Sequence, residues 1–140
     1  MERWVWFAIL SMFFAGFTSV IAKQGLAGIT GELGLTVRTV FVSVFVFLFA
    51  SVAVARTEWS ALTSRHFLWL GASGLTTAIS WIFYYKALKE GEVSTVALID
   101  KGSFIVAVAL AWWFLGEAIT PRKAVGAALI LAGLLVVSRK

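Results

Sequence analysis

Asp100 and Lys101 are two adjacent charged residues inside an apolar run that extends from Val93 to Leu115. If this run forms one helix, Asp100 lies about 6 Å from its midpoint, because each residue adds about 1.5 Å. Inside a lipid bilayer a charge at such depth costs about 2.5–3.5 kcal/mol on insertion scales, and it normally faces other protein or a water-filled cavity. We therefore expect Asp100 to face inward.

Two interpretations of this charged pair stay open. In the functional one, Asp100 accepts hydrogen bonds from a substrate or a cationic partner, while Lys101 neutralises it or binds an anion. In the structural one, Asp100 pairs with Arg38 or Lys23 of another helix and holds the helices together. Neither interpretation allows Asp100 to face lipid.

Aromatic residues form a second candidate group at the end of another apolar run. Trp81, Tyr84 and Tyr85 are close together there, and such rings are typical of the membrane–water interface. Their faces could instead line a cavity and hold an organic cation or amine.

Two basic residues complete the predicted pathway for a substrate or ion. Arg38 lies about one turn inside the second apolar run if that helix begins near Leu33, and it is merely interfacial if Thr36 is the N-cap. Lys23 ends the first run and is either an interfacial anchor or a ligand.

Enzyme chemistry has no support in the sequence. The chain has no cysteine and a single histidine, His66, which stands alone in a polar interval. No nucleophile lies beside a base, and there is no phosphate-binding loop or cluster of metal-ligating residues. We therefore predict no catalytic residues, no metal site and no cofactor.

The elements that must position these residues are five apolar stretches that fill almost the whole chain of 140 residues. They correspond to predicted spans at about 4–21, 33–55, 67–85, 93–115 and 121–138, each near the length of roughly 20 residues that crosses a bilayer. Apolar residues make up 61% of the chain, whereas soluble domains contain about 45–50%. The sequence thus predicts an all-α membrane protein with five transmembrane helices, without a separate soluble domain.

Short connections divide the spans. Gly116 can end the fourth span, and Thr120 followed by Pro121 is a good N-cap and first residue for the fifth. The two spans should therefore form a tight antiparallel hairpin, in which Glu117 caps the turn or pairs with Arg122 or Lys123.

Small residues recur at helical spacing on four of the spans and predict where helices pack closely. The residues of these rows are Ser11, Ala15, Ser19, Gly71, Gly74, Ala78, Ser103, Ala107, Ala128 and Ala132.

Basic residues lie singly or in pairs at the ends of the spans, which indicates contact with lipid headgroups and excludes a nucleic-acid surface. The predicted N-terminal side has five of them, namely Arg3, Arg56, Arg65, Arg122 and Lys123. The opposite side has six, namely Lys23, Arg38, Lys86, Lys89, Arg139 and Lys140. Because these numbers are nearly equal, the charges give little preference for one orientation. We therefore predict dual topology, with an antiparallel homodimer as the result. The alternative that stays open is a fixed orientation, set by Arg3 or by a partner.

Five short stretches stand in a characteristic order along the chain. They are Ala22–Leu26, Val37–Thr39, Ser80–Leu88, Asp100–Lys101 and Phe114–Glu117, with Gly126 and Gly133 after the last. In this order and spacing they resemble a single EamA-type domain of the drug/metabolite transporter superfamily, in its short five-helix form. The resemblance covers nearly the whole chain, 1–140.

The resemblance implies a transporter. Larger members of the superfamily resemble two such units fused in opposite orientation around a central pathway, so this chain corresponds to half of an inverted-repeat transporter and needs a second copy. Alternating access between the two halves would move a small metabolite, an amino acid or an amphipathic compound. The expected location is the cytoplasmic (inner) membrane of a prokaryote, and the expected partners are the lipid bilayer, the small-molecule substrate and a second copy.

Other roles are also compatible with the resemblance. The chain could be a non-transporting membrane scaffold subunit, or a flippase subunit for a lipid-linked carrier. The small multidrug resistance proteins are a related family with four spans and a membrane-embedded glutamate in the first. Here Glu2 precedes the first span, so that route of proton-coupled export is not expected.

The balanced charges generate a testable prediction about topology. A reporter that is active on only one side of the membrane should give signal when fused to the N-terminus and also when fused to the C-terminus, because each terminus lies on that side in part of the molecules. Adding two lysines beside Arg3 should shift both fusions toward a single orientation. A single orientation in the unmodified chain would contradict dual topology.

Overall fold

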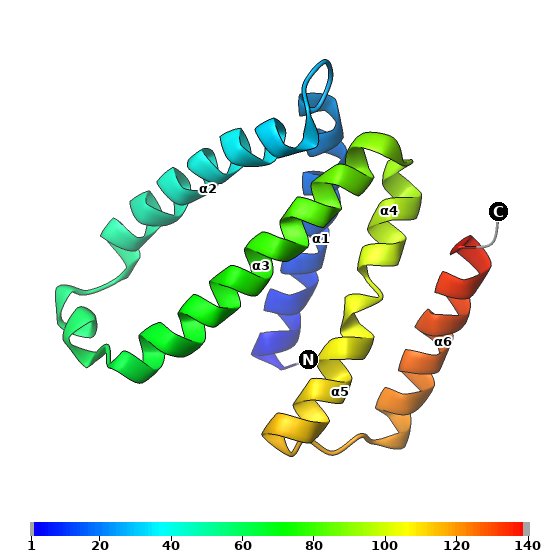
Figure 1. Ribbon diagram of the computed structural model, residues 1–140. Coiled ribbons are helices and arrows are strands. Elements are labelled where there is room, and N and C mark those ends of the chain that lie inside the picture. Colours follow the sequence, from blue (N-terminus) through cyan, green and yellow to red (C-terminus); the bar gives the residue numbers. More distant parts are fainter. Residues whose placement is uncertain (1, 139–140) are drawn as a thin grey trace. The chain divides into compact units, whose positions relative to one another are not determined.

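The computed structural model describes residues 2–138 and is built from helices joined by short connections (Figure 1). The helices are α1 (Arg3–Gly25), α2 (Gly31–Ala53), the 3-10 helix η1 (Arg56–Ala61), α3 (Ser64–Glu90), α4 (Val93–Asp100), α5 (Ser103–Leu115) and α6 (Pro121–Ser138). They form two compact units. The central unit contains residues 21–90, and the terminal unit contains residues 2–20 and 91–138. Arg139 and Lys140, which entered the charge comparison, lie outside the described residues.

Four segments of the described chain are long and apolar enough to cross a membrane: α1, α2, α3 and the 23 residues Val93–Leu115 that contain α4 and α5. Because all secondary-structure elements of the described chain are helices, the predicted all-α class is confirmed. Helix α6, with 18 residues, is not among these segments, so the fifth span stays a prediction. Helix α3 extends beyond the predicted 67–85 because polar residues at both ends continue the helix past its apolar part.

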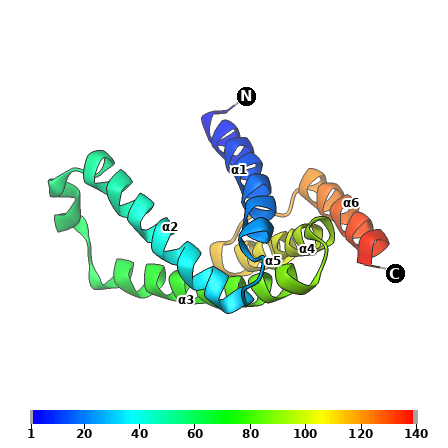
Figure 2. The ribbon, with the colours of Figure 1, turned by 90° about the horizontal axis from the view of Figure 1, so that it is seen from above.

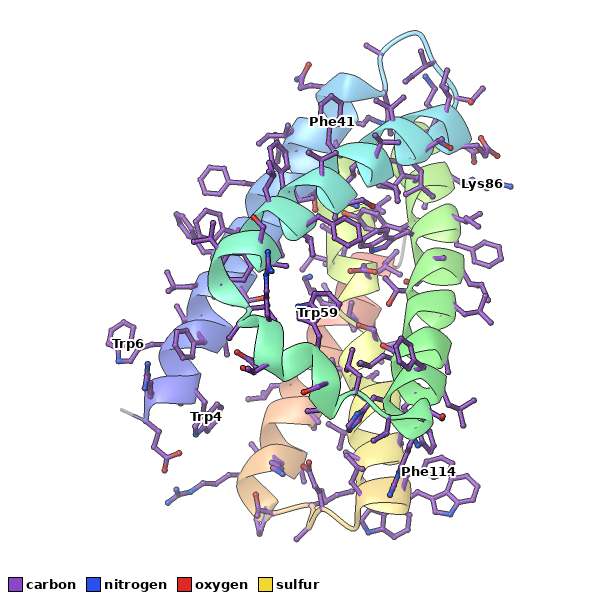
Figure 3. All side chains as sticks on the ribbon, turned by 90° about the vertical axis from the view of Figure 1, so that its left-hand side faces the viewer. Trp4, Trp6, Phe41, Trp59, Lys86 and Phe114 are labelled. Carbon is purple, nitrogen blue, oxygen red and sulfur yellow. The ribbon has the colours of Figure 1, made fainter. Side chains whose placement is uncertain are left out.

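The apolar side chains of the described helices stay largely uncovered. Leu26, Tyr85 and Leu88 are the hydrophobic residues that are buried in this part of the chain, each with at most 4% of its surface exposed. Trp6 and Phe114, by contrast, keep 55% and 71% of their surface exposed and point away from the ribbon in Figure 3. Water does not tolerate so much contiguous apolar surface, so lipid or further protein must cover these helices.

The three buried hydrophobic residues mark the tightest place in the central unit. This place, which we call the junction, joins the end of α1 and the turn after it to the start of α2 and the end of α3. The residues of the junction are Lys23, Leu26, Gly31, Tyr85, Leu88 and Lys89. Thr30 caps α2, because its hydroxyl oxygen accepts a hydrogen bond from the Leu33 N–H at 3.2 Å. From the junction, α2 and α3 run side by side and diverge toward η1, which connects their other ends (Figures 1 and 2).

The fourth apolar segment is not one continuous helix, as the sequence predicts, but two. Helix α4 ends at Asp100, and α5 begins at Ser103. Between them, the Gly102 N–H bonds to the Ile99 carbonyl at 2.9 Å, and the Phe104 N–H bonds to the Lys101 carbonyl at 3.2 Å. These bonds span three residues instead of four, so the turn is tighter than in an α-helix. Figure 1 shows the resulting interruption between α4 and α5.

The hairpin of α5 and α6 in the terminal unit confirms the prediction from local signals. Gly116 ends α5 with φ 67°, a left-handed conformation that favours glycine. The Thr120 hydroxyl accepts a hydrogen bond from the Lys123 N–H at 3.3 Å, and Lys123 Nζ lies 3.3 Å from Glu117 Oε2. Helix α6 begins at Pro121, as predicted.

Gly31 provides a test of the junction. A Cβ atom at this position would lie 2.9 Å from the Tyr85 carbonyl oxygen, which belongs to the backbone of α3 and cannot move alone. We expect Gly31→Ala to lower the free energy of unfolding by about 1–3 kcal/mol, as overpacking usually does. Gly25→Ala is the matched control, because a Cβ there has no neighbour within 4 Å. Unfolding in detergent, followed by helicity, measures both variants; equal stability of the two would contradict close packing at Gly31.

Candidate functional site

A groove of about 1380 Å³ lies between α2 and α3 in the central unit. Its walls are mostly apolar, with Leu35 and Phe47 among the α2 residues that line it. Trp81 lines the groove from α3, together with Gly74 and Ala78. An opening of this size, between two helices that can each cross a membrane, has room for a small organic molecule.

Hydroxyl groups also line this groove, and none of them was among the residues predicted from the sequence for the pathway. Thr36, Thr39 and Ser43 line it from α2, and Ser73 and Thr77 line it from α3. The Thr39 hydroxyl donates to the Leu35 carbonyl at 2.8 Å, and the Thr77 hydroxyl donates to the Ser73 carbonyl at 2.9 Å. Their lone pairs stay available as acceptors toward the groove. The spacing of these residues by three or four was the signal that could have revealed them.

Arg38 is the eighth residue of α2, which begins at Gly31, so it lies inside the helix and is not a cap residue. Its guanidinium carbon lies 4.5 Å from the centre of the Trp81 ring and 5.9 Å from that of the Tyr85 ring. Two of the predicted aromatic residues thus do hold a cation, but that cation is a side chain of the protein. Such contacts contribute about 0.5–2 kcal/mol each, most where water is excluded.

One nitrogen of this guanidinium is left without a hydrogen bond. Arg38 Nη1 is buried and has no acceptor within the described chain. None of the three ion pairs found in residues 2–138 includes Arg38. An unmade hydrogen bond of a buried group costs about 1–3 kcal/mol, and more for a charged one. Arg38 is therefore a charged donor that still needs an acceptor.

The aromatic residues differ in their surroundings. Trp81 is partly exposed and lines the groove, whereas Tyr85 is buried at the junction. The Tyr84 ring is partly exposed and meets the Tyr85 ring edge to face, with 6.2 Å between centres. The arrangement brings Trp81 and Tyr85 together with Arg38; their part in a pathway remains a prediction.

Lys23 and Lys89 tie the helix ends of the junction together. Lys23 Nζ donates to the Leu88 and Lys89 carbonyl oxygens at 2.5 and 3.1 Å. In return, Lys89 Nζ donates to the Leu26 carbonyl oxygen at 2.9 Å. A cation at the carboxyl end of a helix is favourable, because the last carbonyls have no partner in the helix. Lys23 thus has a structural role at the junction; whether it also anchors the interface or borders a pathway remains a prediction.

Asp100 and Lys101 form an ion pair at the break between α4 and α5. Asp100 Oδ2 lies 3.8 Å from Lys101 Nζ, and 38% and 58% of the two side chains are exposed. Neighbouring residues of a regular helix point about 100° apart, but here the tighter turn follows Asp100. The charge of Asp100 is therefore neutralised within its own unit, by Lys101.

The predicted packing rows are mostly uncovered in the described chain. Ser19 is buried and Ala15 is partly exposed. The other eight predicted residues are exposed: Ser11, Gly71, Gly74, Ala78, Ser103, Ala107, Ala128 and Ala132. Close packing at these positions remains a prediction, and it requires protein surface beyond that found within each unit.

Comparison with known proteins decides the class of this molecule. Residues 2–139 match the EamA-like transporter family. The chain belongs to this family. A protein from Sinorhizobium sp, described as "Uncharacterized transporter in cobO 3'region", is 36% identical over 140 residues, which cover 98% of this chain and 97% of that protein. No solved structure matches the chain.

Membership confirms the resemblance seen in the motifs. As an EamA-like transporter, the chain is an integral membrane protein with transmembrane helices and is not an enzyme. We therefore expect the protein to lie in the lipid bilayer and to have a small-molecule substrate. The groove and Arg38 belong to the central unit and the Asp100–Lys101 pair belongs to the terminal unit; their part in transport remains a prediction.

The lysines of the junction provide a second test. Lys23→Met removes charge-assisted bonds to two carbonyls, each worth about 1.5–3 kcal/mol, so we expect a clear loss of unfolding free energy. Lys86→Met is the matched control, since the Lys86–Glu32 pair at 3.2 Å is half exposed and worth about 0–1 kcal/mol. Denaturation in detergent compares them. If Lys86→Met destabilises the protein as much as Lys23→Met, the junction is not the more strongly held contact.

Proposed function

We propose that this EamA-like transporter moves a small metabolite, an amino acid or an amphipathic compound across the cytoplasmic membrane of a prokaryote by alternating access, as an antiparallel homodimer. The groove between α2 and α3 is the observation that carries this proposal. The groove combines apolar walls with hydroxyl acceptors, and it lies between two helices that are long enough to cross a membrane. Such a surface suits a solute that is partly polar and partly apolar.

Two observations support a second copy in the active form. The small-residue rows of α3, α5 and α6 are exposed, and small residues are what helices use to approach each other in lipid. The basic residues are nearly balanced between the two predicted sides of the membrane. We propose that the two copies insert in opposite orientations, that α6 is the fifth span of each, and that residues 1–140 form one EamA-like domain.

The break at Asp100 supports alternating access. Interrupted helices occur near the substrate sites of several transporters, where backbone groups freed from the helix face a cavity. Asp100 and Lys101 are at such an interruption and are both partly exposed. We propose that Asp100, Lys101 and Arg38 lie on the substrate or ion pathway together with Trp81, Tyr84 and Tyr85, and that Lys23 borders it.

Transport by purified protein tests this proposal. An unbiased screen of metabolites for thermal stabilisation supplies candidate solutes, and proteoliposomes then measure their flux. We expect saturable uptake by the wild type and at least a tenfold lower rate for Asp100→Asn, which corresponds to about 1.4 kcal/mol or more. Glu117→Gln is the matched control, because Glu117 lies in the connection after α5 and pairs with Lys123; it should transport normally.

The remaining outcomes separate the competing roles. If no screened solute is moved while the protein is folded and dimeric, the chain acts as a scaffold or flippase subunit and the proposal is wrong. If Asp100→Asn transports like the wild type, Asp100 lies outside the pathway. Folding of each variant is checked by helicity and by its elution volume in detergent.

A further inference from the structure

Arg38 is the charged group of the central unit that the contacts within this unit explain least. It lies seven residues beyond the first residue of α2, or about 10 Å along the helix axis. The acidic side chains on the same helix and in η1 are engaged elsewhere. Glu32 pairs with Lys86 at 3.2 Å, and Glu58 accepts a hydrogen bond from the Ala55 N–H at 3.2 Å.

The contact with Trp81 does not satisfy the donors of Arg38. A guanidinium above a ring uses its flat face, whereas its N–H groups point outward in the plane of the group. One of these nitrogens, Nη1, is buried without an acceptor. The planar fork of N–H donors matches the two oxygens of a carboxylate, which accepts two parallel hydrogen bonds. The missing acceptor therefore has the chemistry of an oxyanion.

Trp81 connects this donor to the groove. The same indole ring that lies under the Arg38 guanidinium also lines the groove, next to the hydroxyl-bearing residues Thr39 and Thr77. Arg38 itself does not line the groove, so an anion held by Arg38 extends past the Trp81 ring to meet the apolar wall and the hydroxyl groups. This combination suits an amphipathic organic anion better than an inorganic ion, which has no apolar part to bury.

We propose that Arg38 binds the carboxylate of an organic anion whose apolar part lies in the groove between α2 and α3. This inference rests on the proposed function and narrows its substrate class to solutes that carry a carboxylate. Trp81 holds the guanidinium in place for this contact. A lipid headgroup phosphate offers similar oxygen atoms, and the experiment below separates the two sources.

The test uses the full-length protein in nanodiscs of phosphatidylcholine, with phenylacetate as the probe. Phenethylamine and 2-phenylethanol serve as matched compounds, since they keep the ring and replace the carboxylate. We expect phenylacetate alone to raise the Tm in a saturable manner, as a ligand of the folded state does. Equal stabilisation by the amine or the alcohol would overturn the proposal. This comparison is made on the wild type, so it does not depend on the folding of any variant.

Variants then assign the effect to Arg38. Arg38→Gln should abolish the stabilisation by phenylacetate, and Arg38→Lys should weaken the apparent affinity at least fivefold, since lysine keeps the charge but lacks the planar fork. Arg65→Gln is the control, because Arg65 is an exposed residue in the first turn of α3 that does not line the groove. If Arg38→Gln responds like the wild type, Arg38 is not the anion site.

Nanodiscs that contain phosphatidylglycerol test the lipid source. If this lipid stabilises the wild type but not Arg38→Gln, and phenylacetate has no effect in either membrane, the acceptor is a lipid phosphate and the proposal is wrong. If Arg38→Gln instead abolishes the dimer without any response to phenylacetate, the acceptor is an acidic side chain of a second copy, which also overturns it.

Flux measurements keep this inference distinct from the proposed function. Saturable transport of uncharged or cationic solutes, equal in Arg38→Gln and the wild type, would support the transporter and overturn the carboxylate site. Stabilisation by phenylacetate that depends on Arg38, without flux of any solute, would support the carboxylate site while the proposed transport fails. Flux of phenylacetate that is lost in Arg38→Gln and kept in Arg65→Gln supports both.

Discussion

The hydrocarbon of a membrane offers no hydrogen bonds, so every polar backbone group of this protein must find its partner within the chain or its ligands. The ends of helices are where this constraint acts most strongly, because the last carbonyls of a helix have no partner in the helix itself. At the junction, Lys23 and Lys89 donate to the carbonyls of Leu88, Lys89 and Leu26. These bonds hold the end of α1 against the end of α3 and thereby fix where α2 begins.

The geometry of the groove follows from this anchoring. Gly31 lets the start of α2 approach the Tyr85 carbonyl closely, and the segment that contains η1 connects the far ends of α2 and α3. Two long helices that touch at one end and diverge toward the other leave space between them. The Thr39 and Thr77 hydroxyls of the groove donate to carbonyls of their own helix, so neither leaves an unpaired donor at this surface. Arg38 does not line the groove, but its buried Nη1 has no acceptor, which makes it the chemically most demanding residue of this unit.

Local signals in the sequence were sufficient to predict those parts of the structure that depend on neighbouring residues. The turn at Gly116, the cap at Thr120 and the pair of Glu117 with Lys123 all lie within eight residues, and each follows from cap or turn chemistry. The membrane class follows from the apolar content alone. The groove could not be predicted, because it depends on the angle between α2 and α3. The contacts between these two helices, such as Glu32 with Lys86 and Arg38 with Trp81, join residues more than forty positions apart, and no local signal in the sequence pairs them.

The interruption of the fourth segment was also missed, although Gly102 directly after two charged residues was a signal for it. Its main consequence concerns voltage. Asp100 and Lys101 carry opposite charges 3.8 Å apart, so together they have no net charge. A membrane potential does work of about 2.3 kcal/mol per elementary charge for each 100 mV crossed, and on a neutral pair this work is close to zero. The membrane potential therefore has little effect on a conformational change that moves these two side chains together. The electrical work of a transport cycle then depends on the charges that move separately from this pair.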